Sequence, residues 1–224
     1  MEKILGIIPS AGKGSRWGGY YKELLPLGDG EWLLDRCIKS MNIADEILII
    51  TSKDKIGTHV SHLNDRFPNV SFTLQKEGYD IMGAIRSSYP FTCKYNLFAM
   101  PDTVYPKYLF DFFFPIGDNE PDFLLGMFQT TMPERFGVLH VDKDGEKIVN
   151  KQKSKNENST PTVLAWGSMI WSDRVVDLWQ DLDIIDYTEA INVAIREFGF
   201  HSYPIDYYFD MATWKDYKEF IYGK

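Results

Sequence analysis

Residues 7–27 read IIPSAGKGSRWGGYYKELLPL and continue a short apolar run that begins at Ile4. The apolar run predicts a strand, and Gly12 and Gly14 free the backbone directly after it. Two glycines so close together let consecutive backbone N–H groups turn toward one point, which makes a concavity that binds anions. A strand that leads into such a loop indicates a phosphate-binding site. Three basic residues add positive charge beside the loop: Lys13, Arg16 and Lys22.

Two familiar phosphate-binding loops do not fit this stretch. The Walker A pattern needs four residues between its first glycine and its Gly-Lys pair, and then Ser or Thr. Here five residues separate Gly6 from Gly12, and Gly14 follows Lys13. The dinucleotide fingerprint needs a third glycine three residues after the second, where this chain has Trp17. The loop is therefore of another kind, with an ordinary glycine-rich turn between a strand and a helix as the alternative.

The composition is that of a globular protein with an acidic balance. The 224 residues are 44% hydrophobic and 25% charged, and they carry a formal net charge of −8. This length suits one domain spanning residues 1–224. The acidic balance argues against a nucleic-acid binder, and a locally basic loop in an acidic chain indicates a small anionic ligand instead.

Targeting and redox features indicate a cytoplasmic protein that binds no membrane. Cys37 and Cys93 show no pairing pattern, which is typical of a reduced cytosolic setting. The N-terminal apolar run is too short for a signal peptide, and the apolar residues 109–116 are far shorter than a membrane span. An aromatic content of 15% leaves room for a homo-oligomer interface but does not fix an oligomeric state.

Strands and helices alternate through the first half of the chain. This order indicates an α/β fold with a mainly parallel sheet. Because ligands collect at the carboxyl ends of such strands, we expect the loop after Ile8, Gln75 and Asp102 to meet at one edge of the sheet. Apolar runs predict strands at residues 4–8, 46–51 and 95–100, and alternation predicts a strand at residues 70–75. An apolar face predicts a helix at residues 31–41, a proline in the first turn indicates one at residues 106–114, and helices are also expected at residues 53–67 and 80–88.

The second half of the chain is richer in strands. Asp144-Gly145 is a hairpin turn signal, and the polar segment 154–161 is predicted to be a mobile loop. Helical patterns cover residues 173–180, 187–198 and 213–222. Strands are predicted at residues 122–128, 137–142, 147–151 and 163–171, and residues 201–208 are strand-like.

The loop and the residues after it resemble the signature of the sugar-phosphate nucleotidylyltransferases, which include glucose-1-phosphate thymidylyltransferases and other NDP-sugar pyrophosphorylases. That signature reads Ala-Ala-Gly-x-Gly-Thr-Arg, then Pro-Lys before Leu-x-Pro. Here SAGKGSR ends at Arg16, and YKELLP has Tyr21 in place of the proline before Lys22. The resemblance implies a three-layer, Rossmann-like sheet of the GT-A type, with helices on both faces and a β-rich sugar-binding subregion. It implies catalytic roles for Arg16 and Lys22 and nucleotide-binding roles for Pro9, Ser10, Ala11, Gly12, Lys13, Gly14 and Ser15.

Two acidic residues extend the resemblance to both ends of the chain. Asp102 follows the strand predicted at 95–100, and Asp210 stands in FDMAT. The second segment resembles the family motif Trp-x-Asp-x-Gly-Thr, with Ala212 in place of the glycine. In that family the two acids together hold Mg²⁺ on the nucleotide phosphates, and oxygen ligands suit this ion. Taken alone, each aspartate is equally well explained as a helix cap or a turn residue.

The segment that reads the pyrimidine base in this family is matched by Gln75 and Gly78, which are followed by the helix predicted at 80–88. A glutamine side chain both donates and accepts hydrogen bonds, so it can pair with one edge of a base. A surface glutamine at a strand end is the alternative.

The acceptor side of the family site is matched more weakly. The Glu-Lys-Pro of the family corresponds to residues 152–154, Gln-Lys-Ser, so only Lys153 remains to meet the sugar phosphate, with Lys151 as a rival. Gly167 matches a glycine close to the bound sugar, and Glu189 falls where a Thr-Asp pair is usual. The missing glutamate leaves the identity of the acceptor open.

The resemblance implies an enzyme that joins a nucleoside triphosphate to a sugar-1-phosphate and releases pyrophosphate. It favours dTTP or UTP and an acceptor like glucose-1-phosphate. The reaction needs no covalent intermediate, so positioning and charge neutralisation suffice. Three alternatives stay open: a cytidylyltransferase for a non-sugar phosphomonoester such as phosphocholine, a catalytically silent nucleotide-binding protein, and a glycosyltransferase with a related sheet. The last predicts a DxD metal motif, which Asp102-Thr103-Val104 does not supply.

Overall fold

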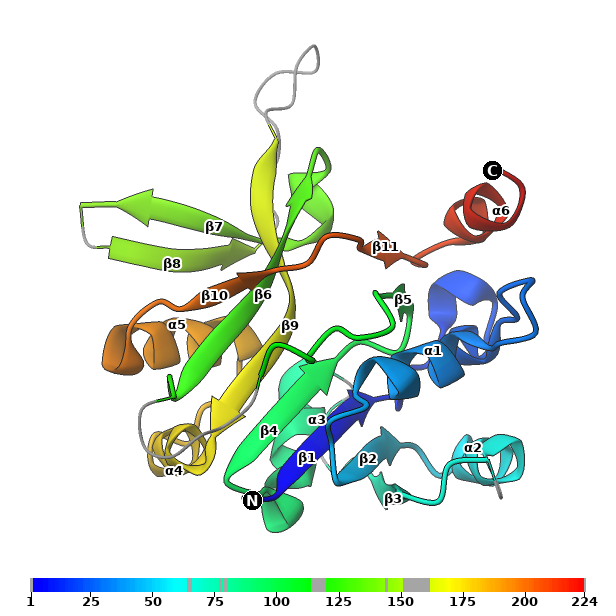
Figure 1. The fold of residues 1–224 in the computed structure, drawn as a ribbon, viewed down its shortest axis with the longest axis horizontal. Helices are drawn as coiled ribbons and strands as arrows, with labels where there is room; N and C mark the ends of the chain where they lie inside the picture. Colours follow the sequence, from blue (N-terminus) through cyan, green and yellow to red (C-terminus); the bar gives the residue numbers. More distant parts are fainter. Residues whose placement is uncertain are drawn as a thin grey trace.

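A mixed sheet runs through the centre of the computed structural model (Figure 1). The structure describes residues 2–63, 66–76, 78, 80–113, 120–143, 145–150 and 162–223. Within these residues seven strands follow the order β10-β6-β9-β4-β1-β2-β3, and β7 and β8 attach beside β9. The α/β class predicted from the alternation of elements is therefore confirmed.

The parallel half of the sheet carries the glycine loop. β1 lies between β2 and β4, and β2 pairs with β3 at the edge, all in parallel. β1, β2 and β4 are buried apolar runs because both faces of the sheet are covered there, whereas the edge strand β3 is only half-buried. Ile4 and Ile8 of β1 pack into one hydrophobic cluster, whereas Leu5 and Ile7 pack into another. These strands, all predicted from the sequence, are β1 (Ile4–Pro9), β2 (Glu46–Thr51), β3 (Val70–Leu74) and β4 (Tyr95–Ala99).

The other half of the sheet is mainly antiparallel. β9 pairs antiparallel with both β4 and β6, so it joins the two halves, and β10 returns parallel to β6. β7 and β8 form the predicted hairpin, which extends beyond the main sheet in Figure 1. These elements are β6 (Phe123–Thr130), β7 (Gly137–Asp142), β8 (Gly145–Asn150), β9 (Val163–Ser172) and β10 (Ser202–Pro204).

Helices cover the sheet in the three layers that the resemblance implies. Cys37 of α1 and Leu63 of α2 pack into the cluster that contains Ile8. Met82 of α3, Trp179 of α4 and Ile191 of α5 pack into the other cluster. The helices are α1 (Leu33–Ser40), α2 (Ile56–Leu63), α3 (Ile81–Ser88), α4 (Asp173–Asp181) and α5 (Tyr187–Phe198).

The end of the chain returns to the glycine loop through a small second sheet. β5 (Thr103–Val104) follows β4 and pairs antiparallel with β11 (Phe209–Asp210). The last helix, α6 (Trp214–Tyr222), begins after its N-cap Thr213, which exchanges hydrogen bonds with Asp216 of the first turn in a capping box. Its Trp214 packs against Trp17 with ring centroids 4.6 Å apart, so residues from both ends of the chain share one aromatic contact.

The helix predicted at residues 106–114 is wrong. Residues 107–112 form turns, and the N–H of Asp111 donates to Tyr108 O while that of Phe113 donates to Phe110 O. Both bonds reach back three residues instead of the four of an α-helix. Phe110 and Phe113 are buried against the sheet whereas Tyr108 is 65% exposed, so tertiary packing of the aromatic side chains overrides the helical pattern.

The strand predicted at residues 201–208 is shorter than expected. Only Ser202–Pro204 pair in β10, and the chain then runs across to β11. The helix predicted at 53–67 is seen as Ile56–Leu63, and the end of that range includes residues outside the described part. The loop predicted at 154–161, the last residue of the strand predicted at 147–151, and Asp144 of the hairpin turn also lie outside the described residues.

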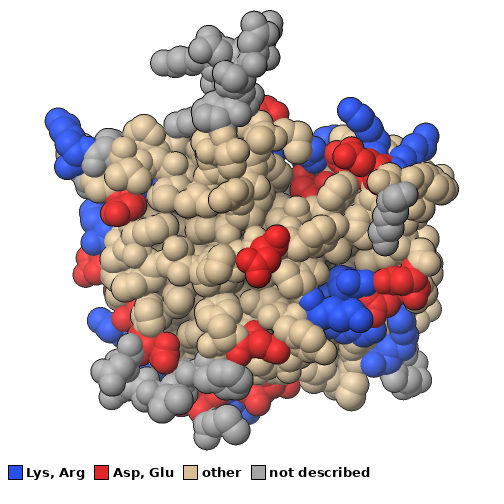
Figure 2. Space-filling view, turned by 45° about the horizontal axis from the view of Figure 1, so that its top comes forward, with Lys and Arg blue, Asp and Glu red and all other residues tan. Residues whose placement is uncertain are grey.

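Among the described residues, no helix combines the length and the apolar character that crossing a membrane requires. On the face drawn in Figure 2, acidic and basic side chains lie close to one another.

Gly126 in β6 lies where the core has no room for a side chain, so adding one methyl group should destabilise the fold. A Cβ atom there would lie 2.2 Å from Ser168 Oγ and 2.8 Å from the ring of Tyr203, two groups that hydrogen-bond to each other at 2.8 Å. We expect Gly126→Ala to lower the free energy of unfolding by about 1–3 kcal/mol, because it overpacks the core. Urea denaturation measures this change.

Gly57 of α2 supplies the matched control. A Cβ atom there meets no atom of the described residues within 4 Å, so Gly57→Ala should leave the stability unchanged or raise it by up to about 1 kcal/mol through helix propensity. Equal effects of the two substitutions would contradict the packing argument at Gly126.

Candidate active site

Two adjoining hollows lie at the carboxyl edge of the parallel strands, and each encloses about 240 Å³. We call the first the loop pocket, because Ser10, Gly12 and Lys22 line it, and the second the aromatic pocket, because Trp166 and Tyr208 line it. Four residues line both hollows, namely Ile81, Met100, Asp102 and Tyr187. The two pockets are therefore halves of one site that meet at Asp102.

The glycine loop follows β1, and its tight turn depends on Gly14. Gly14 has φ +61°, and a Cβ atom there would lie 2.4 Å from Tyr20 O. Its carbonyl accepts hydrogen bonds from the N–H groups of Trp17 at 2.8 Å and Gly19 at 3.1 Å. Gly14 thus closes a tight turn. Pro9, Ser10, Ala11 and Gly12 line the loop pocket, whereas Lys13 and Ser15 are exposed and line neither pocket.

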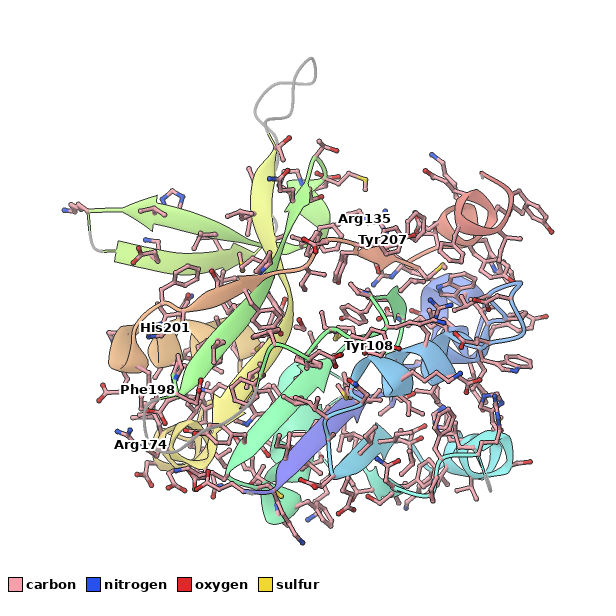
Figure 3. The ribbon with its side chains drawn as sticks, viewed as in Figure 1. Tyr108, Arg135, Arg174, Phe198, His201 and Tyr207 are labelled. Carbon is pink, nitrogen blue, oxygen red and sulfur yellow. The ribbon has the colours of Figure 1, made fainter. Side chains whose placement is uncertain are left out.

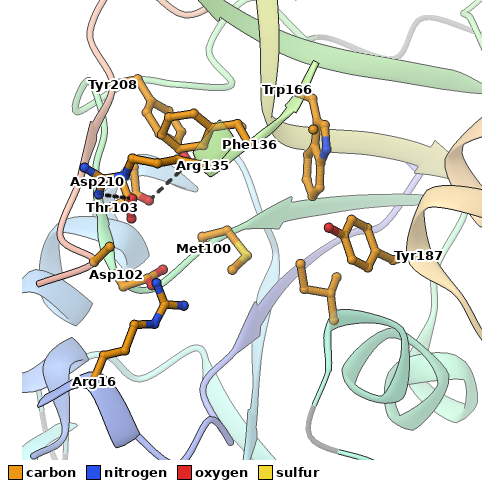
Figure 4. Close-up of a pocket in the computed structure, with 14 residues that line it drawn as sticks. Arg16, Met100, Asp102, Thr103, Arg135, Phe136, Trp166, Tyr187, Tyr208 and Asp210 are labelled. Carbon is orange, nitrogen blue, oxygen red and sulfur yellow. Dashed lines mark hydrogen bonds and ion pairs between the residues drawn. The ribbon is translucent and has the colours of Figure 1, made fainter. Parts of the chain in front are cut away.

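The sequence-predicted catalytic residues lie on the two sides of the site. Lys22 lines the loop pocket, and its ammonium forms an ion pair with the carboxylate of Asp102. Arg16 is exposed and lines the aromatic pocket (Figure 4). Each residue is positioned by a short 3-10 turn, Ser15–Trp17 for the arginine and Lys22–Leu24 for the lysine.

Backbone pairing brings together the two acids predicted to hold a metal. Asp210 of β11 stands opposite Thr103 of β5, and the N–H of Met211 donates to Asp102 O at 2.9 Å. Asp102 is buried, and both aspartates line the aromatic pocket. Residues more than a hundred positions apart thus place their carboxylates in one hollow.

Arg135 is a site residue that the sequence analysis missed. It follows β6 and lies beside the chain that connects β10 to β11 (Figure 3). Its guanidinium donates to Asp210 Oδ2 at 2.6 Å and to both carboxylate oxygens of Asp216 at 3.1 Å. The available signal was an arginine between two predicted strands, which is weak because it specifies no partner.

The acidity of the two partners of Arg135 differs. Burial, with the neighbouring Asp102 carboxylate as a second cause, raises the pKa of Asp210 to about 6, and Arg135 opposes this shift only in part. Burial would also raise the pKa of Asp216, but hydrogen bonds from Arg135 and Thr213 outweigh it and lower the pKa. At Asp210 the combined effect of burial and of the Asp102 carboxylate therefore outweighs the compensation that Arg135 gives.

The carboxylates of Asp102 and Asp210 favour a bound cation, but they do not supply a complete set of ligands for it. Among the described residues, no group of three or more His, Cys, Asp or Glu side chains could hold a metal ion. Asp102 and Asp210 supply two carboxylates in one hollow, and the raised pKa of Asp210 is a deficit that a divalent cation would relieve. A cation bound here would complete its coordination with oxygens of a ligand or of water.

Aromatic side chains form the far wall of the second hollow. The ring of Tyr208 stacks on Phe128 with centroids 3.7 Å apart, and Trp166 lies 5.9 Å from Tyr187 (Figure 4). The indole Nε1 of Trp166 is buried without a hydrogen-bond partner in the described structure. Burial raises the pKa of Tyr208 well above its ordinary value, so this phenol stays neutral.

Gly167, predicted to lie near the bound sugar, is part of this wall. A Cβ atom at Gly167 would lie 2.3 Å from the ring of Tyr208, and its carbonyl accepts a 2.7 Å hydrogen bond from the hydroxyl of Tyr105. Packing within the chain therefore already requires a glycine here.

Gln75, predicted to read a base, lines the loop pocket but also holds its own turn together. Its backbone N–H donates to Thr51 O at 2.8 Å, and its side-chain amide donates to Gly78 O at 3.0 Å and to Asp80 O at 3.3 Å. Gly78 has φ +58°, which permits that turn. Asp80 then caps α3 by accepting from Gly83 N at 2.7 Å.

Two predicted acceptor residues are not placed in either pocket. Glu189 is exposed in the first turn of α5, where its N–H donates to Asp186 at 2.9 Å, and it lines neither hollow. Lys153 and its rival Lys151 lie outside the described residues. Tyr187, at the start of α5, enters both hollows instead.

No protein-family model and no curated protein sequence matches this chain. Solved structures do match it. A Bacillus anthracis protein in complex with sucrose, provisionally assigned as a glucose-1-phosphate thymidylyltransferase, superposes with a TM-score of 0.79 at 19% identity and covers 97% of this chain and 93% of its own. The chain has the nucleotidylyltransferase fold.

Two further structures support this nucleotidylyltransferase fold. The inositol-1-phosphate CTP transferase from T. maritima has a TM-score of 0.73 at 14% identity and covers 97% of this chain and 94% of its own. HddC from Yersinia pseudotuberculosis has a TM-score of 0.70 at 18% identity and covers 98% and 97%. At these identities the likeness establishes the fold, and the function has to be argued from the site.

Asp210 and Asp216 predict opposite dependences of stability on pH. The raised pKa of Asp210 gives stability that is present below its ordinary value of 3.8 and is lost as the pH rises through about 6. Relative to the wild type, Asp210→Asn should therefore gain about 1–3 kcal/mol of unfolding free energy between pH 4 and pH 7. Urea denaturation without divalent metal, across this pH range, measures the gain.

Asp216→Asn is the paired control. The lowered pKa of Asp216 gives stability that is present above the ordinary value of 3.8 and is lost as the pH falls through the folded-state value. This variant should therefore lose stability relative to the wild type as the pH rises toward 4. The same sign of pH dependence in both variants would contradict the assigned shifts.

Proposed function

We propose that this chain is a nucleotidylyltransferase that joins a nucleoside triphosphate to a sugar-1-phosphate and releases pyrophosphate. The acceptor phosphate oxygen attacks the α-phosphorus, the bond from that phosphorus to the α–β bridging oxygen breaks, and pyrophosphate leaves with both electrons of that bond. One observation supports the proposal above others: the glycine loop, Lys22, Asp102 and Asp210 converge on two adjoining pockets in a nucleotidylyltransferase fold.

The residues of the loop pocket suit a triphosphate. The backbone after β1 offers N–H groups and, at Gly12, an approach free of side-chain atoms. Lys22 neutralises charge as it builds at the α-phosphate. Arg16 lines the adjoining aromatic pocket, from where it neutralises the leaving pyrophosphate. Lys22 is held at Asp102, where the two pockets meet, so it stands between nucleotide and acceptor.

Asp102 and Asp210 would hold Mg²⁺ in this proposal. When bound, the ion supplies charge neutralisation and alignment of phosphate oxygens. The raised pKa of Asp210 supports this assignment, because a carboxylate beside another carboxylate favours a bound cation.

The aromatic pocket suits the acceptor. Phe136, Trp166 and Tyr187 offer flat apolar faces for a sugar ring. Lys153 remains our prediction for the residue that steers the acceptor phosphate, and Glu189 remains a predicted sugar contact. We favour dTTP or UTP and an acceptor like glucose-1-phosphate.

A second candidate is cytidylyl transfer to a non-sugar phosphomonoester. The match to an inositol-1-phosphate CTP transferase over 97% of this chain favours it, as does the loss of the Glu-Lys-Pro pattern at residues 152–154.

We further propose that the enzyme works in the cytoplasm, since Cys37 and Cys93 are both free thiols. Assembly into a homo-oligomer remains a prediction from the composition.

The test is pyrophosphate release across dTTP, UTP, CTP, ATP and GTP with Mg²⁺. Each nucleotide is paired with glucose-1-phosphate, inositol-1-phosphate and phosphocholine, and with no acceptor as the control. We expect release with one nucleotide class and only when an acceptor is present. Release that ignores the acceptor would indicate a hydrolase, and no release from any pair would overturn the proposed activity.

Asp102→Asn should lower kcat by about 10²–10³-fold, because it removes a charge that acts on the reacting phosphates. Its fold should persist, as followed by circular dichroism and thermal melting. The proposed role of this aspartate at the metal fails if the variant keeps wild-type turnover in Mg²⁺.

The matched control for this substitution is Asp173→Asn. Lys94 and Asp173 form an ion pair at 3.5 Å near the opposite, amino end of β4, far from the hollows that Asp102 lines. This pair is partly exposed at the surface and distant from the pockets, so the control should change neither kcat nor KM measurably.

A further inference from the structure

A cluster of buried charges lies beneath the loop pocket and has no part in the chemistry described above. Glu23, Lys55 and His59 are 1%, 3% and 0% exposed, and the first two line the pocket. Sequence patterns gave no sign of this cluster, because its members come from separate segments. Glu23 lies in the 3-10 turn that carries Lys22, Lys55 precedes α2, and His59 lies within α2.

One oxygen of Glu23 gathers these segments. Its Oε1 accepts from Lys55 Nζ at 2.7 Å and from Ser10 Oγ at 3.1 Å, and it lies 3.0 Å from His59 Nε2. The other ring nitrogen of His59 lies 2.8 Å from Thr51 Oγ1, a residue at the end of β2. Lys55 also donates to Ser10 O at 3.3 Å.

Burying the Glu23–Lys55 pair costs desolvation free energy, so stabilising the core does not explain why the pair is there. Removing a carboxylate and an ammonium from water costs several kcal/mol each, and a well-packed apolar pair is often as stable. Burial would raise the pKa of Glu23, but hydrogen bonds from His59 and the charge of Lys55 lower it, so the carboxylate stays ionised. The geometry must therefore serve a purpose besides filling space.

The contacts identify that purpose. Ser10 is the first residue after β1 and forms the wall of the loop pocket, and the cluster holds both its hydroxyl and its carbonyl. Glu23 is bonded directly to Lys22, whose ammonium meets Asp102. Fixing Glu23 therefore fixes the start of the glycine loop and the lysine of the site relative to each other.

We infer that the Glu23–Lys55 pair positions the nucleotide-binding loop and Lys22 for the reaction, an inference that rests on the proposed function. Both are positioning residues, since they act through Ser10 and Lys22. Lys55 also lies over the ring of Tyr21 at 5.0 Å, and the Tyr21 hydroxyl donates to Asp54 O at 3.0 Å, which ties the lysine turn to the segment before α2.

The chain contains a cluster of the same chemistry that lines neither pocket. Asp35 of α1 is fully buried, its Oδ1 lies 2.9 Å from His62 Nε2, and its Oδ2 accepts from Arg66 at 2.6 Å. Both clusters hold α2 to the N-terminal part of the chain through a carboxylate, an imidazole and a cation. Of these two clusters, only the Glu23 cluster lines the loop pocket. If both clusters served only to stabilise the fold, substitutions in either would have the same effect on the kinetic constants.

The test compares Glu23→Gln with Asp35→Asn in the full-length protein. We expect Glu23→Gln to lower kcat by about 10²-fold, the effect of misplacing a catalytic group by roughly an ångström. KM for the nucleotide should rise several-fold, and KM for the acceptor should stay unchanged. Asp35→Asn should lower the melting temperature and leave the kinetic constants of the folded protein within twofold of the wild type.

A double variant separates positioning from stability. Glu23→Gln with Lys55→Met removes both buried charges, so it should regain most of the melting temperature that Glu23→Gln loses, yet keep the low kcat. The inference is overturned if the double variant recovers kcat together with stability, or if Glu23→Gln and Asp35→Asn change the kinetic constants equally.

Nucleotide binding distinguishes failure of this inference from failure of the proposed function. Calorimetric titration with the triphosphates of the screen, in Mg²⁺, measures affinity without turnover. If the wild type binds a triphosphate but releases no pyrophosphate, the proposed activity fails. The inference then stands if Glu23→Gln binds that triphosphate several-fold more weakly while Asp35→Asn does not, and it falls if both variants bind it equally.

Discussion

The pairing of β11 with β5 is the constraint on which the rest of the site depends. It is only two residues long on each side, yet it fixes Asp210 opposite Thr103 and the N–H of Met211 on the carbonyl of Asp102. Backbone hydrogen bonds have fixed geometry, so this short ladder sets the spacing of two carboxylates that lie more than a hundred residues apart in the chain. Contact between Trp214 and Trp17 secures α6 against the glycine loop. The same return of the chain thus assembles acids and loop together.

Charge compensation follows from that convergence. Two carboxylates in one hollow repel each other, and each forms an ion pair with a basic side chain. Asp102 pairs with Lys22, and Asp210 pairs with Arg135. A nucleotide under the proposed function carries its own negative charge and competes for these cations. Arg135 keeps a second partner in Asp216, so it can release Asp210 without losing all compensation. Under the proposed function these ion pairs are therefore suited to exchange partners when a substrate binds.

The sequence predicted the parts of this arrangement that depend on local pattern. The strands of the parallel half and the loop after β1 follow from apolar runs and glycines, which act within a few residues. The helix at 106–114 failed because Phe110 and Phe113 are held by the sheet, and no local pattern encodes that contact. Arg135 and Lys55 were missed for the same reason, since their partners lie 75 and 32 residues away. Asp102 and Asp210 were found only because a family resemblance supplied their pairing.

Three glycines of the site show how geometry separates folding from binding. Gly14 has a left-handed φ and a carbonyl 2.4 Å from its missing Cβ, and Gly167 has the Tyr208 ring at 2.3 Å, so the chain itself requires both. Gly12 lacks a positive φ, and no atom of the described residues lies within 4 Å of its missing Cβ, although it lines the loop pocket. With respect to the described part of the chain, a side chain there would meet only what enters the pocket. Since the fold does not account for Gly12, close approach of a ligand to the backbone is the reason left, and this glycine is the strongest single sign in the loop that something binds there.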